Sequence, residues 1–225
     1  MYQELEEIPL FDGIKVSDLK KISSLVTHQK IKRNQLIIRQ GDVCQYFYVI
    51  KKGQAKITLT RDPDHEVILA FLSEGEFFGE LSLLDEDICS ANVYAQQACE
   101  LMCIKSENFK KLLKTVPELS YRLLYHMAQR IRYSDRCIHN LNIKNSTRRI
   151  GIVLLHLAEQ SGYRYKDSVI IKKIPFQQDI ASLAGTSRET VSRSFSRLQD
   201  HAYIQKNGRH LVINDYKRFY REFSS

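Results

Sequence analysis

The spacing of apolar residues changes twice along this chain. From about residue 36 to residue 105, short runs rich in valine, isoleucine, tyrosine and phenylalanine alternate with glycine-containing breaks. Short β-forming runs separated by regularly spaced turns are typical of a small β-barrel or β-roll. Short helices are predicted before and after this region, over residues 17–28 and from Ser106 onward. The breaks contain Gly41, Gly53, Gly75 and Gly79.

Helical spacing begins at Pro117 and predicts one long helix that ends near Ile143. Its apolar residues fall on the a and d positions of a heptad, with Ser134 as the polar residue in that seam. Such a seam predicts a partner helix, and a helix of this length spans about 40 Å. We therefore predict a parallel dimerisation helix, the alternative being a helix packed on the roll of its own chain. The seam residues are Leu124, Met127, Ile131, Ile138 and Leu141.

Two shorter helices joined by a tight turn are predicted between residues 176 and 199. Gly185 supplies a turn residue that tolerates positive φ, and Thr186 is predicted to cap the second helix, which then begins at Ser187. The second helix has one apolar stripe at i, i+4 and i+7. The stripe residues are Val191, Phe195 and Leu198.

Polar side chains occupy the face beside this stripe. Arginine can donate two hydrogen bonds to guanine, glutamate can accept from cytosine, and serine can reach a base or a phosphate. The pattern therefore predicts a helix-turn-helix whose second helix enters the major groove of DNA. A capping box between Thr186 and Glu189, with solvated arginines, is the structural alternative and is compatible with base contact. The polar face comprises Arg188, Glu189, Ser192, Arg193 and Ser196.

The surrounding segments complete a winged helix. A helix is predicted around residues 147–160 and a strand around residues 168–174, and two β runs flank Asn207-Gly208, the favoured dipeptide of a type I′ hairpin. Lys206, Arg209 and His210 lie near that hairpin, where they are candidates for phosphate contacts.

Charge is distributed unevenly. Residues 144–225 contain 15 Lys+Arg against 7 Asp+Glu, whereas residues 1–143 contain 19 of each, so the net charge of +8 resides in the C-terminal third. Neutralisation of DNA phosphates requires such an excess and makes binding depend on salt. Binding to an anionic membrane is disfavoured because no long basic amphipathic helix with a large apolar face is evident there.

Composition indicates a globular chain of two domains, since 225 residues with 43% apolar and 27% charged content suffice for proper cores. The acidic N-terminus and the lack of an apolar run of about 20 residues predict a cytoplasmic protein without membrane contact. Without a CxxC pair, the cysteines are expected to be reduced thiols, structural and not metal-bound. They are Cys44, Cys89, Cys99, Cys103 and Cys137.

These patterns predict an α+β fold with three parts: a β-roll sensor domain over residues 1–116, a dimerisation helix over 117–143 and a winged-helix DNA-binding domain over 144–225. No phosphate-binding loop, nucleophile elbow or paired metal-ligand motif is evident, so neither an enzyme nor a metal site is predicted. A non-DNA signalling module is the alternative, but it leaves the basic third unexplained.

The chain resembles the cyclic-AMP receptor protein and FNR family of bacterial transcription regulators. The roll glycines, the long helix and the segments FFGELSLLDEDICSANVYA and TSRETVSR carry this resemblance. It implies a homodimer that reads a palindrome with TGA-containing half-sites and that contacts RNA polymerase if it is an activator. TGTGA-like and TTGA-like half-sites both remain open. The residues implied to bind DNA are Gln177, Gln178, Thr186, Ser187, Arg188, Glu189, Ser192 and Arg193.

The resemblance also implies an effector site in the roll. Family members that bind cyclic nucleotides have a phosphate-binding cassette in which an arginine precedes Ser-Ala, and here Cys89 occupies that position. Loss of this charge-assisted contact lowers affinity by about 2–3 kcal/mol, which argues against control by cyclic AMP. The implied effector residues are Gly79, Glu80, Leu81, Cys89 and Ser90 in the cassette and Ser134 and Asp135 in the long helix.

Several effectors remain open at this stage. A cyclic nucleotide, another small molecule and no ligand at all are each compatible with the cassette. Haem or redox sensing is a further alternative, although the cysteine motif of an iron-sulfur sensor is absent from the N-terminus. The candidate ligands for such sensing are Cys44, Cys89, Cys137, His28 and His126.

Overall fold

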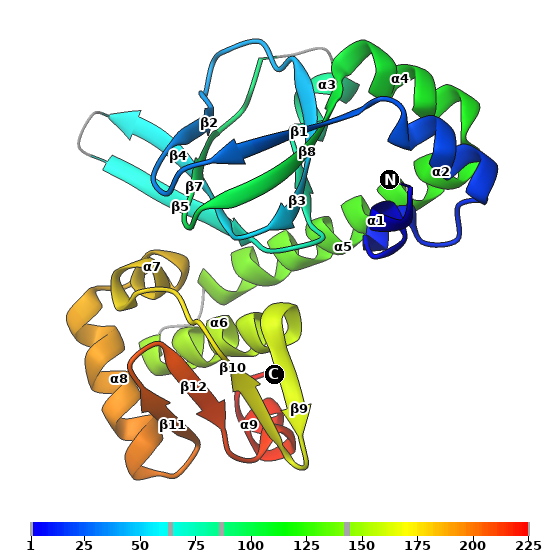
Figure 1. The fold of residues 1–225 in the computed structure, drawn as a ribbon. Coiled ribbons are helices and arrows are strands. Elements are labelled where there is room, and N and C mark those ends of the chain that lie inside the picture. Colours follow the sequence, from blue (N-terminus) through cyan, green and yellow to red (C-terminus); the bar gives the residue numbers. More distant parts are fainter. Residues whose placement is uncertain (1, 63–64, 86–87, 142–144, 225) are drawn as a thin grey trace. The chain divides into compact units, whose positions relative to one another are not determined.

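Two antiparallel four-stranded sheets form a β-roll in the first part of the chain (Figure 1). In the computed structural model, which describes residues 2–62, 65–85, 88–141 and 145–224, the strand orders are β1-β8-β3-β6 and β2-β7-β4-β5. The strands are Val26–Ile31 (β1), Leu36–Ile38 (β2), Tyr46–Lys52 (β3), Ala55–Asp62 (β4), His65–Leu72 (β5), Phe77–Phe78 (β6), Asn92–Ala95 (β7) and Cys99–Lys105 (β8).

Strand β3 is apolar on both faces because both faces are covered. Phe47 and Val49 pack against the helices outside the roll, whereas Tyr48 and Ile50 point into the core between the two sheets. Alternate residues of a strand face opposite sides, so a strand buried on both sides is continuously apolar. β8, which pairs with β3, has the same two-sided burial.

Helices cover the outer face of the first sheet. They are α1 (Gln3–Glu6), the 3-10 helix η1 (Pro9–Phe11), α2 (Val16–Ser23), α4 (Ser106–Thr115) and the start of α5 (Pro117–Leu141). The prediction of one helix over residues 17–28 is wrong at its C-terminal end. α2 ends at Ser23, and Val26–Ile31 instead pair with β8 as β1. Strand pairing within the fold has overridden the local helical pattern.

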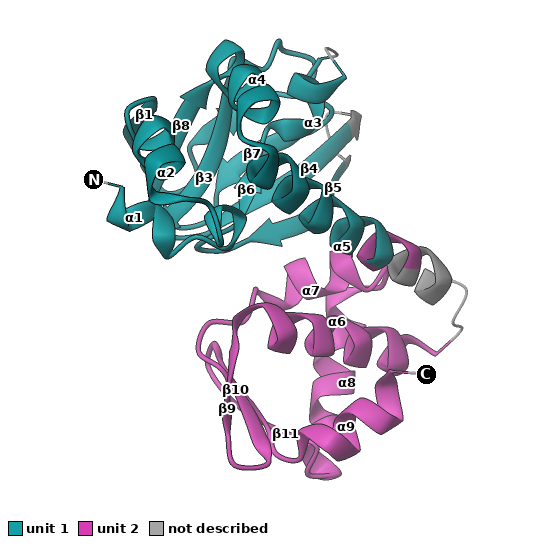
Figure 2. Ribbon diagram, turned by 90° about the vertical axis from the view of Figure 1, so that its right-hand side faces the viewer, with its two compact units in different colours: residues 1–132 teal, residues 133–225 magenta. Residues whose placement is uncertain are grey.

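The long helix α5 begins at Pro117, as predicted, and is described as far as Leu141; residues 142–144 lie outside the described residues. Leu119 and Leu123 are buried against the core of the first unit. Contacts divide the chain within α5, between Arg132 and Tyr133, so this helix contributes to both compact units (Figure 2).

The second unit combines helices with a small antiparallel sheet of order β11-β12-β10-β9. One continuous core joins the helices to the sheet and includes Leu154, Val191, Phe195 and Leu211. The elements are α6 (Ser146–Ser161), β9 (Gly162–Tyr165), β10 (Ser168–Ile171), α7 (Gln177–Leu183), α8 (Arg188–Asp200), β11 (Ile204–Asn207), β12 (His210–Ile213) and α9 (Tyr216–Phe223).

The hairpin between β11 and β12 differs from the prediction. Asn207 pairs with His210, so the two loop residues are Gly208 and Arg209. Gly208 has a φ of +57°, but Arg209 is not among the residues with positive φ. A type I′ turn requires positive φ at both central residues, so the predicted type I′ turn at Asn207-Gly208 is wrong.

Every helix in the described part of the chain is too short or too polar to span a lipid bilayer.

The end of α8 generates a stability prediction. Ala202 has a φ of +56°, and the amides of Ala202 and Tyr203 donate to the carbonyls of Gln199 and Leu198. An L-residue in this region costs about 1–2 kcal/mol, whereas glycine adopts it freely. We expect Ala202→Gly to raise the free energy of unfolding by about 0.5–1 kcal/mol in urea titrations, after the greater freedom of glycine in the unfolded chain is subtracted.

Ala128→Gly in the interior of α5 is the matched control, and it is expected to lower the free energy of unfolding by about 1 kcal/mol. Equal destabilisation by both substitutions would contradict the argument.

Candidate functional site

The turn between α7 and α8 fixes where the second helix begins. Gly185 has a φ of +58°, its amide donates to Ser182, and the amide of Thr186 donates to Ala181. These two bonds form a Schellman motif, which ends α7. The amide of Thr186 is part of this motif, so Thr186 belongs to the end of α7 and not to the start of α8. Ser187 is the N-cap of α8, because its Oγ accepts from the amide of Thr190 at 3.3 Å. The predicted cap at Thr186 is therefore wrong by one residue, and Glu189 lies at N2, outside the capping-box position of the alternative.

A side chain of α6 holds this turn in place. Arg149 Nε donates to the carbonyl of Ala184 at 2.7 Å, and its Nη2 donates to the carbonyl of Gly185 at 3.1 Å. The guanidinium thus binds carbonyl groups that the end of α7 leaves without helical partners. Sequence reasoning missed Arg149. Its signal is an arginine near the N-terminus of a helix, where the helix dipole disfavours a cation.

The face of α8 predicted to read DNA is exposed. Val191, Phe195 and Leu198 are buried in the core, which leaves the opposite side of the helix to solvent. The predicted contact residues of the first two turns lie on that side, and Arg193 Nη2 is 3.5 Å from Oγ1 of Thr190, which was not among the predicted contacts. The exposed residues are Ser187, Arg188, Glu189, Ser192, Arg193 and Ser196, and Thr186 is half-buried beside them.

Glu189 lies in the first turn of α8, where its carboxylate is favoured. Hydrogen bonds from its own backbone amide and from Ser187 hold the pKa of Glu189 below its usual value, and Arg188 and Arg193 add to this effect. The side chain is therefore an ionised acceptor at neutral pH. An ionised carboxylate can accept a hydrogen bond from the exocyclic amine of cytosine.

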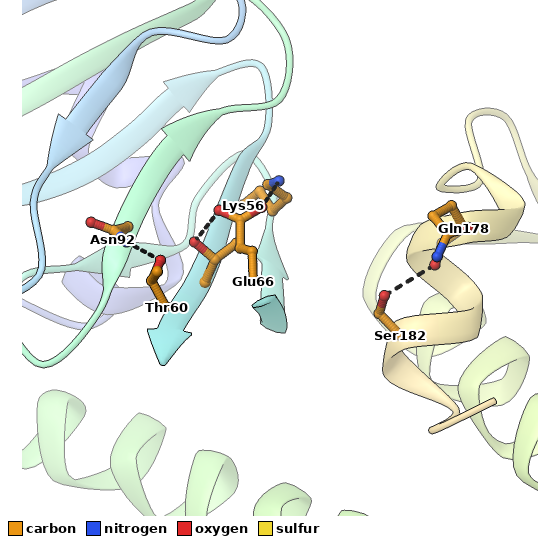
Figure 3. Close-up of polar contacts among 7 residues, drawn as sticks. Lys56, Thr60, Glu66, Asn92, Gln178 and Ser182 are labelled. Carbon is orange, nitrogen blue, oxygen red and sulfur yellow. Dashed lines mark hydrogen bonds and ion pairs between the residues drawn. The ribbon is translucent and has the colours of Figure 1, made fainter. Parts of the chain in front are cut away.

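The other two predicted contact residues begin α7. Gln177 is half-buried and Gln178 is exposed. The carbonyl of Gln178 accepts a hydrogen bond from Ser182 Oγ at 3.1 Å, so the amide side chain of Gln178 stays separate from this bond (Figure 3). Asp179 accepts from the amide of Phe176 and caps the helix.

The hairpin arginine, a predicted candidate for a phosphate contact, also has a structural role. Arg209 Nε donates to the carbonyl of Ile174 at 2.8 Å, and its guanidinium lies 4.7 Å from the centre of the Phe176 ring. Arg209 thus anchors the hairpin to the segment that leads into α7. Lys206 is half-buried and His210 is exposed on the same hairpin.

In the roll, the cassette begins with a short helix, α3 (Glu80–Leu84), that follows Gly79 with a φ of +85°. A Cβ at residue 79 would lie 2.8 Å from the carbonyl of Tyr46, so this position requires glycine. Glu80 is buried, whereas Leu81 and Ser90 are exposed. At Gly79 and Glu80, the backbone therefore has the glycine turn and the short helix with which the predicted cassette begins.

Glu80 is paired with an arginine that the sequence reasoning missed. Arg130 on α5 donates to Glu80 Oε1 at 2.7 Å and to the carbonyl of Phe77, and its guanidinium lies 4.4 Å from the centre of the Phe77 ring. Burial raises the pKa of Glu80, while the charge of Arg130 acts in the opposite direction. The sequence marks Arg130 only as a cation that directly precedes Ile131, one of the apolar seam residues of α5.

The glutamate end fits a ribose, but the other end of the cassette does not fit a cyclic phosphate. Glu80 Oε2 is buried and has no hydrogen-bond partner among the described residues, so it can accept from a ligand hydroxyl. At the arginine position, Cys89 is uncharged, 3% exposed and bonded through sulfur to Cys44. The side chain at residue 89 therefore cannot neutralise a phosphate.

The prediction of reduced cysteines is wrong for this pair. Cys44 and Cys89 form a disulfide with a Cα–Cα distance of 5.7 Å. They are 45 residues apart in sequence, and a backbone bridge between Val43 and Ile88 brings their segments together. Cys99 and Cys103 are free and buried, as predicted. The side chain of Cys137 lies outside the described residues.

Among the described residues, the two candidate histidines have different neighbours. Ser134 and Asp135 are exposed on α5 in the second compact unit. His28 lies 3.3 Å from Glu4, and the His126 ring meets the Phe77 ring edge-on. Burial lowers the pKa of His126, so its imidazole is neutral at pH 7. In the described part of the chain, no three His, Cys, Asp or Glu side chains are grouped to hold a metal ion.

A hollow of about 830 Å³ lies beside the disulfide. A hydrogen-bond network links the strands around it: Asn92 donates to Thr60 at 3.0 Å, and Glu66 accepts from Thr58 and Lys56 (Figure 3). The lining residues are Arg39, Gln40, Gly41, Thr60, Glu66, Ile88, Cys89, Ser90, Asn92 and Tyr94.

Comparison with known families identifies both units. Residues 28–116 match the cyclic nucleotide-binding domain family, and residues 148–222 match the Crp-like helix-turn-helix domain family. Together with the roll and the helix-turn-helix, these matches define a transcription regulator with an effector-type domain.

Whole-chain relatives give the family. The chain is 33% identical over 186 residues to the cAMP-activated global transcriptional regulator CRP of Salmonella typhimurium, covering 82% of this chain and 88% of the relative. It is 32% identical over 203 residues to the cAMP-activated global transcriptional regulator Vfr of Pseudomonas aeruginosa, covering 87% and 94%. The protein belongs to the Crp/Fnr family of bacterial transcription regulators.

Solved structures agree with the fold. FixK2 from Bradyrhizobium japonicum superposes with a TM-score of 0.77 at 19% identity, covering 87% of this chain and 96% of that one. The catabolite activator protein of Thermus thermophilus is 28% identical, with a TM-score of 0.54 and coverage of 94% and 96%.

The pairing of Arg130 with Glu80 generates a prediction. Arg130→Met leaves a buried carboxylate without its cation, and removing one member of a buried pair costs 3–5 kcal/mol. Because the Arg130 side chain is one-third exposed, we expect a loss of about 3 kcal/mol in the free energy of unfolding, measured by urea titration at fixed protein concentration.

Arg33→Met is the matched control, because Arg33 is exposed in the turn after β1. We expect it to change the free energy of unfolding by less than about 0.5 kcal/mol. A similar small loss for Arg130→Met would mean that the pair contributes little.

Proposed function

We propose that this regulator binds, as a homodimer, a palindromic DNA site with TGA-containing half-sites. The observation that carries the proposal is the exposed polar face of α8, presented by a turn that Ser187 caps and Arg149 holds. Arg188, Glu189, Ser192 and Arg193 are the proposed base contacts. The N-terminal turns of a second helix with such a face enter the major groove.

Gln177, Gln178, Thr186 and Ser187 are proposed as accompanying contacts to phosphates or bases. The net charge of +8 over residues 144–225 supports binding to a polyanion. Binding should therefore weaken steeply as salt is raised, because bound phosphates release counterions. We infer a cytoplasmic location, since that is where bacterial DNA lies.

The exposed face of α5 supports the homodimer. Leu124 and Ile131, two of the predicted seam residues, are 68% and 62% exposed, and Tyr121 and Tyr125 are exposed beside them. Met127 is half-buried and packs against the core of the roll. Large apolar side chains at helical spacing, left in water, are suited to a second copy of the same helix. The side chains of Ile138 and Leu141 lie outside the described residues.

The roll is proposed to act on DNA binding through α5. Arg130 on α5 is bonded to Glu80 at the start of the cassette helix, so a change at the cassette reaches the proposed dimer helix directly. When two half-sites lie one helical turn of DNA apart, the two α8 helices of the dimer must have the same separation to enter both major grooves. If the regulator is an activator, RNA polymerase is its further partner.

Cyclic AMP is disfavoured as the effector. The domain family binds cyclic nucleotides, but Cys89 brings no charge to the phosphate position. Another small molecule at Glu80, or control without a bound ligand, fits the site better, and Ser134 and Asp135 remain candidates for contacts to a base.

Base reading by Arg193 is testable. We expect Arg193→Ala to weaken binding to the palindrome by about 1–3 kcal/mol and to relax preference at one base pair per half-site, because a bidentate contact to guanine is lost. Fluorescence anisotropy against a series of single-base variants measures both effects.

Arg197→Ala, exposed further along α8, is the control and should weaken all duplexes about equally. Uniform weakening by Arg193→Ala would make Arg193 a phosphate contact instead.

The dimer face is testable by introducing charge. Leu124→Glu combined with Ile131→Glu should convert the dimer to a monomer at micromolar concentration, because four carboxylates would be buried in the interface. Analytical ultracentrifugation measures the change. Gln129→Glu, exposed on the same helix, should leave the dimer intact. A wild-type monomer, in solution and on DNA, would overturn the homodimer.

The cassette is testable by restoring the arginine. Cys89→Arg, made in a Cys44→Ser background so that no unpaired Cys44 remains, should raise the affinity for cyclic AMP by about 100-fold relative to Cys44→Ser alone. Isothermal titration calorimetry gives both affinities. Tight binding of cyclic AMP by the unmodified protein would contradict the argument from Cys89.

A further inference from the structure

The disulfide joins two segments at the part of the cassette farthest along the chain from Glu80. Cys89 directly precedes Ser90 at the end of the cassette that begins with Gly79, and Cys44 precedes β3. The segments are also hydrogen-bonded to each other, since the amide of Gly41 donates to the carbonyl of Cys89 and the amide of Cys89 donates to the carbonyl of Asp42, both at 2.8 Å. The disulfide therefore closes a small local structure of which Cys89 is the centre.

The two sulfur-bearing residues differ in exposure. Cys89 is 3% exposed and packs in the core between the sheets, whereas Cys44 is half-buried between the exposed residues Val43 and Gln45. One cysteine is thus placed to meet a reagent from solvent, and the other is placed to resolve the product. The hollow of about 830 Å³ is lined by Cys89 and by Gly41, whose amide is bonded to Cys89, so a small molecule has room on the Cys89 side of the pair. Such a volume lies within the range of about 300–1,000 Å³ that is usual for small-molecule sites.

Whether a disulfide is permanent or reversible depends on the redox conditions of the cellular compartment. Disulfides of cytoplasmic proteins, when they occur, are usually transient and redox-sensing, because thiol buffers keep other cysteines reduced. Cys99 and Cys103 are buried thiols, and burial raises the pKa of Cys103 to about 12, so Cys103 is protonated and unreactive. Among the cysteines whose side chains are described, Cys44 and Cys89 are therefore the pair available for exchange.

We propose that Cys44 and Cys89 form a reversible dithiol–disulfide pair that exchanges with a small-molecule disulfide and that fixes the cassette when oxidised. This inference rests on the proposed function for its cytoplasmic setting and for its effect on DNA. Small peptide disulfides such as oxidised glutathione are the chemical class of oxidant.

The exchange proceeds in two steps that balance. The Cys44 thiolate attacks one sulfur of the oxidised reagent, which forms a mixed disulfide and expels one reagent thiolate. The Cys89 thiolate then attacks the Cys44 sulfur and expels the second reagent thiolate. The protein loses two protons and two electrons in total, and the reagent disulfide is reduced to two thiols.

Oxidation should change the order of the cassette. In the oxidised protein, the disulfide and two backbone hydrogen bonds, made by the amides of Gly41 and Cys89, join the two segments. In the reduced protein, only the two hydrogen bonds join them. In the disulfide-bonded structure, Glu80 meets Arg130 on α5. Oxidation therefore favours the arrangement of α5 from which the roll acts on DNA, and the oxidised form should bind the palindrome more tightly.

Thiol counting tests the chemistry on the full-length native protein. Reduced protein should show five alkylatable thiols after denaturation, and protein treated with oxidised glutathione should show three, with Cys44 and Cys89 joined in the peptide map. Reduced glutathione should restore all five without unfolding the protein. Failure to form this disulfide, or resistance of the native disulfide to reduced glutathione, would overturn the proposal.

Hydrogen exchange tests the effect on the cassette. Reduction should speed amide exchange at Gly41 and Cys89 at least tenfold and leave the paired strands β3 and β8 unchanged. Cys44→Ser should exchange like reduced wild type under both conditions. Cys99→Ser, which removes a buried thiol outside the pair, should keep the response. Identical exchange in oxidised and reduced wild type would make the bond a structural crosslink and would overturn the proposal.

DNA binding completes the test and separates the two proposals. Oxidised wild type should bind the palindrome at least fivefold more tightly than reduced wild type, and Cys44→Ser should show no difference. Equal affinity of both forms for the palindrome would overturn the regulatory role. If neither form binds the palindrome while thiols and exchange respond as expected, the proposed DNA function fails and the redox pair stands.

Discussion

The ion pair between Glu80 and Arg130 links the roll to the long helix α5 within the first compact unit. Glu80 begins the cassette helix, Arg130 belongs to α5, and the same guanidinium also binds the carbonyl of Phe77 and covers its ring. A carboxylate this deeply buried needs a cation, because isolated charges are strongly disfavoured away from water. The pair therefore fixes the cassette and the long helix in one mutual arrangement within the first unit. Oε2 of Glu80 has no hydrogen-bond partner among the described residues. A ligand that donates a hydrogen bond to Oε2 would therefore bind a carboxylate whose other oxygen is already bonded to Arg130 on α5.

The second unit depends on a comparable constraint at the turn before α8. The apolar stripe of α8 fixes its rotation, but its starting residue depends on how α7 ends. Gly185, the Ser187 cap and Arg149 together determine that start. A shift of one residue would rotate the polar face by about 100°, because the helical repeat is 3.6 residues. Presentation of Arg188 and Arg193 therefore depends on a backbone motif and on an arginine of α6.

Local patterns in the sequence predicted much of this fold, and contacts distant in sequence account for the errors. The roll, the long helix and the helix-turn-helix could be predicted because each follows from the spacing of apolar and turn residues that are close together in the sequence. The disulfide could not be predicted, since Cys44 and Cys89 meet only after the strands have paired. Arg130 was missed because a cation on a helix indicates nothing of a buried glutamate 50 residues earlier. The cap was misplaced because Thr186 and Ser187 are both common N-cap residues, and the Schellman bond of Thr186, which assigns it to the end of α7, is visible only in the structure. The contact residues proposed for DNA and effector stay predictions, since exposure and proximity do not identify a ligand.

The continuity of α5 across the division between the two units carries one more consequence. Because α5 is one continuous helix, the number of residues between Arg130 and a later position sets a rotational phase about the helix axis between the side chain that binds Glu80 and the side chain at that position. Insertion or deletion of one residue turns that phase by about 100°, whereas seven residues nearly restore it, with a drift of about 20°. Changes in the length of this helix among relatives should therefore come in whole heptads, or be matched by changes elsewhere, even though the surface loops of the roll are free to vary by single residues.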